Sequence, residues 1–399
     1  MSPINPTEKY VVLQGDGMGD HPSDALDGKT PLEAARTPHM DELAQRGELG
    51  RVRTIPDGLP AGSDVGNMSI MGYDPRQYYT GRAALEAASM GVVPAPGDLM
   101  LRCNLVQLAV RDEDRVMADY SADHLPTDRG RTLIGRIAAM LSDELFSFYP
   151  GVSYRHLMIW RGGADRIDPG GLELTPPHNI PDQPIEDYLP QGRGAKPLRE
   201  LIERSWEILD GEEANSIWFW GAGTPPDLPP FRSIHGLTGV VISAVDLIKG
   251  LAIYADLEPI SVPGATGYLD TNYAGKVEAA LAHLEERDLA YVHIEAPDET
   301  SHEGDLEKKL QAIEAFDANV VAPILDGLGA FKSFAALILT DHYTPVQLQV
   351  HTADPVPYLI YRSRDANADE RDRGFNERSA AESPIYLTEG HRIMERLLG

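Results

Sequence analysis

The 399-residue sequence contains one cysteine, Cys103, and few basic side chains. A single cysteine excludes an intrachain disulfide and a thiolate metal cluster, which favours a reducing compartment such as the cytoplasm. The 35 basic residues stand against 62 acidic ones, a net charge of −27. This charge repels nucleic acid and no basic tract offsets it, so nucleic acid is not an expected partner.

Long hydrophobic runs are also missing from the sequence. Nowhere do 18 apolar residues stand together, and no basic segment followed by an apolar one opens the chain, so neither membrane association nor secretion is expected. Hydrophobic residues make up 42% of the chain and charged residues 24%, which is typical of a globular protein with a sizeable core. A homo-oligomer is compatible with these features, and the sequence does not decide it.

Short apolar segments rich in β-branched residues alternate with amphipathic segments along much of the chain. Such alternation predicts an α/β fold, with a doubly wound, mostly parallel sheet. The expected strands are 10–13, 240–243, 259–262, 290–294, 335–339 and 357–361, and the expected helices are 31–46, 244–255, 273–287, 306–328 and 389–398. In such a sheet, ligands collect at the carboxyl ends of the strands.

The middle third of the sequence differs because three proline-rich stretches interrupt it. They read TPPHNIPDQP, YLPQGRGAKP and GAGTPPDLPPF, and their proline density forbids long regular elements there. We therefore expect an inserted α+β domain at 101–234 and a catalytic core formed by 1–100 and 235–399.

Carboxylates and imidazoles follow several of the expected strands. Asp16 stands between glycines after the first strand, and the pair Asp341-His342 ends the most apolar one. Taken singly, each has a structural explanation such as a turn or a helix cap. The full set is Asp16, Asp298, His302, Asp341, His342 and His351. Brought together at one sheet edge, these six suit two divalent ions, Mn²⁺ or Zn²⁺, and two-metal sites are well suited to phosphoryl transfer.

Ser63 is the candidate nucleophile. It follows a glycine in the small-residue stretch PAGSDVGNMS and stands at the start of an expected helix. The N-terminus of that helix would hold a phosphate through its backbone N–H groups, although a plain N-cap is the alternative role for such a serine. A divalent ion lowers the pKa of a bound hydroxyl directly, so this nucleophile needs no neighbouring base.

Motifs along nearly the whole chain resemble one family, the cofactor-independent phosphoglycerate mutases of the archaeal type, within the alkaline phosphatase superfamily. The segments that carry the resemblance are GDGMGD, GKTPLEAARTPHMDELA, GSDVGNMSIMGYDP, YYTGRAALEAASMGV, RCNL, FYPGVSYRHL, TPPHNIP, NSIWFWGAG, GVVISAVDLIKGLAIYADL, VPGATGYLDTNYAGK, HIEAPDETSHEGD, TDHYTP and HTADPVPYLIY. The resemblance implies one metal ion on Asp16, Ser63, Asp341 and His342, and another on Asp298, His302 and His351. It also implies that Ser63 is transiently phosphorylated.

The implied reaction converts 3-phosphoglycerate to 2-phosphoglycerate without 2,3-bisphosphoglycerate. Ser63 takes the phosphoryl group, glycerate reorients, and the group returns to the 2-hydroxyl. The inserted domain is expected to act as a lid that keeps water away from phosphoserine. The expected substrate contacts are His124, Arg155, Arg82 and Lys276, since guanidinium groups pair with oxyanions.

The sequence departs from the family pattern at two places. Ser121-Ala122-Asp123 precedes His124 where the family commonly has a glycine before the histidine, and Thr300-Ser301 stands where Ala-Gly is common. The chain also looks closest to a bacterial branch for which a homoserine kinase role has been proposed. A metal-dependent phosphotransferase or phosphatase on another small metabolite therefore stays open, although no Walker-type GxxxxGK[ST] motif is present. A catalytically silent metal-binding or sensory protein is the third hypothesis.

Overall fold

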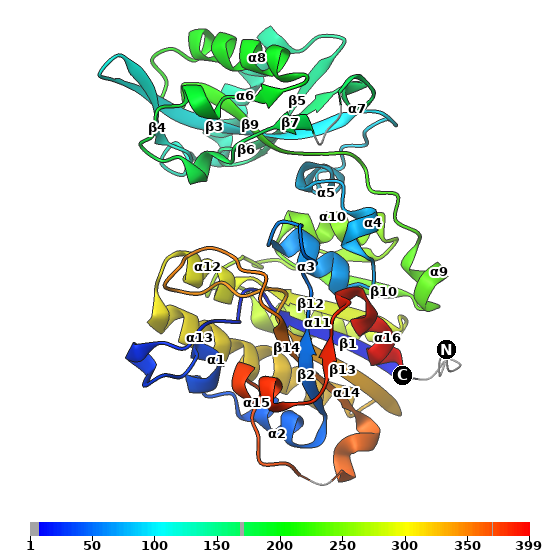
Figure 1. The fold of residues 1–399 in the computed structure, drawn as a ribbon. Helices are drawn as coiled ribbons and strands as arrows, with labels where there is room; N and C mark the ends of the chain where they lie inside the picture. Colours follow the sequence, from blue (N-terminus) through cyan, green and yellow to red (C-terminus); the bar gives the residue numbers. More distant parts are fainter. Residues whose placement is uncertain (1–7, 168–170, 369) are drawn as a thin grey trace. The chain divides into compact units, whose positions relative to one another are not determined.

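The computed structural model describes residues 8–167, 171–368 and 370–399. Within these residues the chain forms two compact units (Figure 1): unit 1 comprises the chain up to Tyr79 together with Asp227–Gly399, and unit 2 is Thr80–Pro226. Unit 2 therefore begins and ends earlier than the insertion expected at 101–234. Helix α5 (Arg82–Ser89) accounts for the earlier start, because its alanines form a small apolar cluster with strand residues of unit 2.

Unit 1 contains an eight-stranded sheet in the order β11-β10-β12-β1-β13-β14-β2-β15. These strands are β1 (Glu8–Gly15), β2 (Glu48–Val52), β10 (Gly239–Ile242), β11 (Glu258–Ile260), β12 (Leu289–Ile294), β13 (Ser333–Leu339), β14 (Val356–Arg362) and β15 (Tyr386–Leu387). Among the described strands of this sheet, β14 runs antiparallel to both of its neighbours, and the other pairs are parallel. The predicted α/β fold with a mostly parallel sheet is confirmed.

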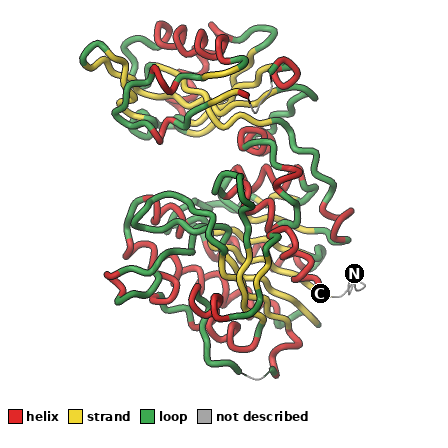
Figure 2. The backbone as a smooth tube through the Cα atoms, in the orientation of Figure 1, coloured by secondary structure: helices red, strands yellow, loops and turns green. Residues whose placement is uncertain are grey.

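Helices cover both faces of this sheet (Figure 2). They are α1 (Pro31–Ala34), α2 (Pro38–Arg46), α3 (Ser63–Ile70), α4 (Pro75–Tyr78), α9 (Phe231–His235), α10 (Asp246–Tyr254), α11 (Tyr273–Leu284), α12 (Ala296–His302), α13 (Leu306–Phe316), α14 (Ala322–Leu328), α15 (Glu377–Glu382) and α16 (Ile393–Leu398), with short 3₁₀ turns η1 (Asp24–Leu26), η6 (Ser363–Asn367) and η7 (Gly390–Arg392). Val11 and Leu13 share a core cluster with α2, α11, α13 and α14. Successive strand residues point to opposite faces, and outside that cluster α3 contacts both α10 and α16.

Two of the expected helices are more complex than predicted. The segment 31–46 divides into α1 and α2 because Pro38 disfavours helical backbone at the residue before it, and Ala35 is already extended with ψ of 150°. The segment 306–328 stays helical throughout, but its middle is a π-helix, η5 (Asp317–Val321). The fully buried Asp317 accepts a hydrogen bond from the Met40 amide at 2.8 Å, which ties this turn to α2.

Unit 2 is built on an antiparallel sheet in the order β4-β3-β6-β5, with β9 also paired to β3. Its strands are β3 (Leu99–Arg111), β4 (Asp114–Asp119), β5 (Phe146–Val152), β6 (Arg155–Trp160), β7 (Leu172–Glu173), β8 (Gln191–Gly192) and β9 (Ser216–Gly223); its other helices are α6 (Thr127–Leu141), α7 (Gly163–Arg166) and α8 (Ala195–Ile208), with 3₁₀ turns η3 (Pro177–Asn179) and η4 (Glu186–Tyr188). Cys103 lies in the core that β3 shares with α6 and α8. The long elements only overlap the edges of the proline-rich stretches, since α8 begins at Ala195 near the end of the second stretch and β9 ends at Gly223 near the start of the third.

Among the described residues, every helix is too short or too polar to cross a lipid bilayer.

Candidate active site

The carboxyl ends of β1, β12 and β13 lie side by side in the sheet, since β1 pairs in parallel with both of the others. Asp16 directly follows β1, and Asp341 and His342 follow β13. Asp298 lies in α12, the helix after β12. Parallel pairing therefore delivers side chains from three distant sequence segments to one edge of the sheet, as the strand-end positions predicted.

The first group of candidate ligands surrounds His342. Its Nε2 atom lies 3.2 Å from Ser63 Oγ. The same nitrogen lies 3.4 Å from Asp16 Oδ1 and 3.4 Å from Asp341 Oδ2. All four side chains are buried. The structure thus brings together the four residues expected to hold one metal ion.

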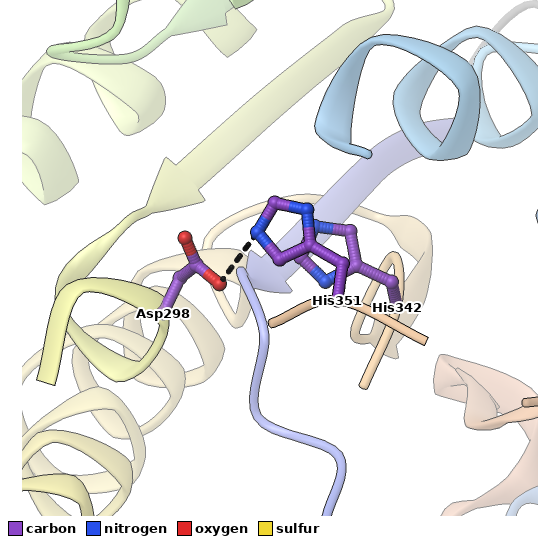
Figure 3. Close-up of side chains that lie close together, drawn as sticks. All are labelled: Asp298, His342 and His351. Carbon is purple, nitrogen blue, oxygen red and sulfur yellow. Dashed lines mark ion pairs between the residues drawn. The ribbon is translucent and has the colours of Figure 1, made fainter. Parts of the chain in front are cut away.

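The second group consists of Asp298, His302 and His351. Asp298 Oδ2 lies 3.2 Å from His302 Nε2, and its Oδ1 lies 3.4 Å from His351 Nε2. The two Nε2 atoms are 2.8 Å apart. Figure 3 shows His351 beside His342, with Asp298 facing its ring; the two imidazoles stack with centroids 4.0 Å apart. The two groups are therefore adjacent.

The chemistry of these side chains fits divalent cations. Asp16 Oδ1 is buried without a hydrogen-bond partner. Burial, followed by the charges of Asp341 and Glu295, raises the pKa of Asp16 well above its ordinary value. A positive charge at this place would relieve that repulsion. Oxygen and imidazole ligands together suit Mn²⁺ or Zn²⁺.

Helix α3 approaches the ligands closely through Gly66. A Cβ atom at this position would lie 2.9 Å from Asp341 Cβ and 3.0 Å from its carbonyl oxygen, so glycine is required for the approach. Asn67, one residue on, donates from Nδ2 to Asp341 Oδ2 at 3.1 Å and to the Ser63 carbonyl at 2.9 Å. Ser63 is the first residue of α3, after Gly62 at the N-cap. The helix thereby fixes the serine against the carboxylate.

Thr344 connects the two ligand groups. Its hydroxyl donates to Asp298 Oδ1 at 2.5 Å and lies 3.1 Å from His342 Nδ1. With Nδ1 occupied in this way, His342 presents Nε2 to Ser63. Sequence reasoning did not single out Thr344, which stands two residues after the Asp341-His342 pair.

Two further buried groups at this edge were also missed. His293, in β12, lies 2.7 Å from Asp16 Oδ2 through its Nε2 atom. Glu295 Oε2 is buried without a hydrogen-bond partner and lies 3.5 Å from the same nitrogen. A histidine inside the apolar strand sequence LAYVHI was the available signal. Lys276, an expected substrate contact, donates from Nζ to the His293 carbonyl at 3.3 Å, and burial lowers its pKa to about 8.

Unit 2 carries a cluster of arginines around one carboxylate. Arg82 Nε lies 2.9 Å from Glu86 Oε1, and Arg102 Nε lies 2.9 Å from Glu86 Oε2. The Arg102 guanidinium also stacks 4.0 Å from the Trp220 ring centroid. Burial alone would raise the pKa of Glu86, but Arg102 and then Arg82 hold it below its ordinary value. Arg82 was expected at an anion site, whereas Arg102 and Glu86 were not singled out.

Sequence comparison assigns the chain to a family. A model described as 2,3-bisphosphoglycerate-independent phosphoglycerate mutase matches residues 44–215. The chain is 50% identical to the Geobacter sulfurreducens protein named "Probable 2,3-bisphosphoglycerate-independent phosphoglycerate mutase", over 98% of this chain and 99% of that one. It is 49% identical to a Methanosarcina barkeri protein of the same name without the qualifier, over 97% of this chain and 98% of that one. The chain belongs to this family.

Solved structures agree with this assignment. A Pyrococcus horikoshii protein superposes with a TM-score of 0.80 at 27% identity, covering 98% of this chain and 97% of that one. A cofactor-independent phosphoglycerate mutase from Thermoplasma acidophilum superposes with a TM-score of 0.62 at 25% identity, covering 98% and 99%. The mutase fold therefore extends over nearly the whole chain.

The segment before His124, where the chain departs from the mutase family pattern, has left-handed backbone. Ala122, Asp123 and His124 all have positive φ, at 49°, 54° and 50°. Left-handed backbone is costly for residues other than glycine, which explains why glycine suits this turn. Asp119 holds the turn by accepting hydrogen bonds from the Ser121 and Asp123 amides, each at 2.7 Å. The substrate contacts of His124 and of the exposed Arg155 stay predictions.

The second departure leaves the metal ligands untouched. The Thr300 hydroxyl donates to the Ala296 carbonyl, and the Ser301 hydroxyl donates to the Pro297 carbonyl, both within α12. Both hydroxyls donate to backbone carbonyls four residues earlier in the same helix, so they point along the helix and not toward the metal ligands. His302 therefore keeps its position one turn after Asp298.

Proposed function

We propose that this chain is a phosphoglycerate mutase that interconverts 3-phosphoglycerate and 2-phosphoglycerate through phosphoserine at Ser63, without 2,3-bisphosphoglycerate. The observation that carries the proposal is the surroundings of Ser63. Its hydroxyl lies 3.2 Å from His342 Nε2, at the start of α3. Membership of the mutase family supplies the substrate class. A role in glycolysis and a cytoplasmic location, both expected from the sequence, accompany this proposal as predictions.

The proposal includes two divalent cations, Mn²⁺ or Zn²⁺. Asp16, Ser63, Asp341 and His342 would hold one, and Asp298, His302 and His351 would hold the other. When bound, these ions supply Lewis acidity that lowers the pKa of the Ser63 hydroxyl and offsets charge on the phosphoryl oxygens. The two groups of converging ligand atoms support this assignment.

The residues around Ser63 determine how the phosphoryl group is received. The backbone N–H groups of Ser63 and Asp64 precede the first intrahelical hydrogen bond of α3 and favour an oxyanion at its N-terminus, whereas the Val65 N–H donates to Asp64 Oδ1 at 3.0 Å. Ser63 Oγ loses its proton and forms a bond to phosphorus as the bond from phosphorus to the C3 oxygen breaks, and that oxygen takes up one proton and leaves as the 3-hydroxyl of glycerate. The 2-hydroxyl then loses its proton, attacks phosphoserine and regenerates the Ser63 hydroxyl.

We assign the anionic groups of the substrate to basic residues, which the proposal places in unit 2 and at Lys276. Arg82 and Arg102 both pair with Glu86, so guanidinium groups, which pair well with oxyanions, gather in this part of unit 2. Unit 2 would also exclude water from phosphoserine, because hydrolysis there would turn the mutase into a phosphatase. We expect Arg155→Ala and Arg82→Ala each to raise KM for 3-phosphoglycerate at least tenfold, measured by steady-state kinetics.

The test of the nucleophile is Ser63→Ala. We expect this variant to lose turnover, because it lacks the hydroxyl that is proposed to receive the phosphoryl group, while its circular dichroism stays that of the unmodified protein. The measurement is a coupled assay of 2-phosphoglycerate formation from 3-phosphoglycerate, with Mn²⁺ and without bisphosphoglycerate. Mutase activity retained in Ser63→Ala would refute the mechanism.

A matched control lies in the same helix. Ser69→Ala also removes a buried hydroxyl from α3, but that hydroxyl donates to the Thr54 carbonyl and touches none of the proposed ligands. We expect this variant to keep its turnover. Homoserine with ATP, assayed in parallel, separates the mutase from the alternative phosphotransferase: activity on that pair alone, with the metal bound, would replace the proposed function.

A further inference from the structure

His293 is a buried imidazole at the candidate metal site to which the proposed mechanism gives no role. It lies in β12, next to β1 in the sheet, and its side chain has no exposed surface. Nε2 lies 2.7 Å from Asp16 Oδ2, and Nδ1 lies 3.1 Å from Ser243 Oγ. Ser243 follows β10, the next strand in the sheet. Three adjacent strands therefore contribute to one chain of contacts.

The hydrogen bonds of this chain define one tautomer. A neutral imidazole carries one N–H, and the atoms that face its two ring nitrogens, Ser243 Oγ and Asp16 Oδ2, decide which nitrogen holds it. Ser243 Oγ already accepts the Val245 amide at 3.0 Å, which leaves its hydrogen for His293 Nδ1. The ring proton then belongs on Nε2, which faces the carboxylate of Asp16.

This arrangement uses one oxygen of Asp16 and leaves the other for a ligand. Oδ2 accepts the His293 N–H, whereas Oδ1 has no hydrogen-bond partner and lies 3.4 Å from His342 Nε2. A carboxylate that is held through one oxygen cannot rotate to bind an ion through both. Residues that orient ligands in this way tune metal affinity without touching the metal.

We propose that His293, held by Ser243, is a positioning residue that presents Asp16 Oδ1 to the cation of the Ser63 group. This inference rests on the proposed function, because it requires a cation at Asp16. A competing arrangement is a further cation on Asp16, His293 and Glu295, whose ligand atoms lie within 4.8 Å of one another. The positive charge of Lys276, bonded to the His293 carbonyl, already stands beside that cluster and disfavours another cation there.

The test is calorimetric titration of the metal-free full-length protein with Mn²⁺. His293→Asn keeps a polar group near the position of Nδ1 but loses the donor to Asp16, whereas the longer His293→Gln returns an N–H to the position of Nε2. We expect His293→Asn to weaken one class of Mn²⁺ sites about 10- to 100-fold and to leave the other class unchanged. We expect His293→Gln to recover most of that affinity, and Ser243→Ala to weaken the same class about threefold.

Steady-state kinetics of the same variants test the positioning role independently of metal affinity. A positioning role predicts that kcat of His293→Asn falls at saturating Mn²⁺ while KM for 3-phosphoglycerate stays within about twofold, because substrate contacts are not touched. The control is His235→Asn, which removes a buried imidazole bonded to the Met71 carbonyl in the same unit and outside the site. Its Mn²⁺ isotherm should match that of the unmodified protein.

Three results would overturn the positioning role. The first is a His293→Asn isotherm equal to that of the unmodified protein. The second is three bound Mn²⁺ ions in the unmodified protein and two in His293→Asn, which would make His293 a ligand. The third result applies if His293→Asn does not fold: it is a Mn²⁺ isotherm of Ser243→Ala that equals the isotherm of the unmodified protein. An unmodified protein that binds no Mn²⁺ would instead overturn the proposed function, and the positioning role with it.

Discussion

Unit 1 and unit 2 handle charge in opposite ways. In unit 1, buried carboxylates and imidazoles gather at the carboxyl ends of parallel strands, with Asp16 left partly without a partner. In unit 2, Arg82 and Arg102 both pair with the carboxylate of Glu86 beside an antiparallel sheet. The first arrangement attracts cations and the second attracts anions.

The difference also teaches how each kind of sheet builds a site. The carboxyl ends of parallel strands lie at one edge of the sheet, so strand pairing alone brings the residues that follow these strands close together. Arg82 comes from the start of α5 and Arg102 from near the start of β3, so their meeting depends on how α5 packs. A cation site can therefore be inferred from strand ends, whereas an anion site of the second kind requires the tertiary structure.

Metal removal should produce the largest difference in thermal stability between the two units. We expect chelation to abolish turnover and to lower the unfolding temperature of unit 1, because a ligand present at 1,000 times its Kd stabilises the folded state by about 4 kcal/mol. All four tryptophans lie within 160–220, so tryptophan fluorescence reports unit 2. Thermal scans by circular dichroism and by fluorescence should diverge after chelation. A fluorescence transition that moves as far as the circular dichroism transition would contradict the separation.

Arg102→Ala should have the next largest effect, confined to unit 2. Removing one partner of a buried ion pair costs about 3–5 kcal/mol, and this variant also removes the guanidinium stacked on Trp220. Urea unfolding followed by tryptophan fluorescence measures the loss. Arg102→Lys keeps the charge without the planar fork and should recover part of the stability. An unchanged midpoint in Arg102→Ala would show that Glu86 is balanced by Arg82 alone.

A smaller, pH-dependent effect is expected from Glu377 in unit 1. This buried carboxyl accepts hydrogen bonds from Thr30 Oγ1 at 2.6 Å and from the Asp20 amide at 3.1 Å, and burial raises its pKa from 4.5 to about 7. Because the folded pKa lies above the unfolded one, its favourable contribution is complete below about pH 4.5 and is lost as pH rises through 7. The change amounts to about 3 kcal/mol.

Glu377→Gln tests this sign. Relative to the unmodified protein, the variant should gain unfolding free energy as the pH rises from 5 to 8, because it has no charge to bury. Denaturant unfolding followed by circular dichroism at each pH gives the comparison. Parallel pH profiles for the two proteins would contradict the expected titration, and the tryptophan signal of unit 2 serves as the internal reference.

Much of the fold and of the candidate metal site was predictable from the sequence. The six expected strands all coincide with strands of the sheet, although β11 ends at Ile260, before the expected 262. Apolar runs ending in polar residues mark a buried strand and its functional end together, which is why Asp16 and Asp341 were found. Strands β2 and β15 were not predicted, because the charged residues of β2 interrupt its apolar pattern and β15 has only two residues.

The remaining misses share another cause. His293 was hidden because an imidazole inside an apolar strand is commonly a satisfied core residue, and only the distance to Asp16 gives it a role. Arg102 and Glu86 are 16 positions apart, and α5 must pack on the sheet before they meet. The break before Pro38 was readable in principle, since proline restricts the preceding residue.

The labelling rate of the single thiol, Cys103, measures how often the sheet of unit 2 opens. Cys103 has no exposed surface in the central strand β3, and burial raises its pKa, so it is inert toward thiol reagents while that strand stays closed. Each labelling event therefore requires β3 to open, and at high reagent concentration the labelling rate equals the opening rate. Comparing that rate with and without 3-phosphoglycerate would show whether substrate slows the local opening of β3 in unit 2.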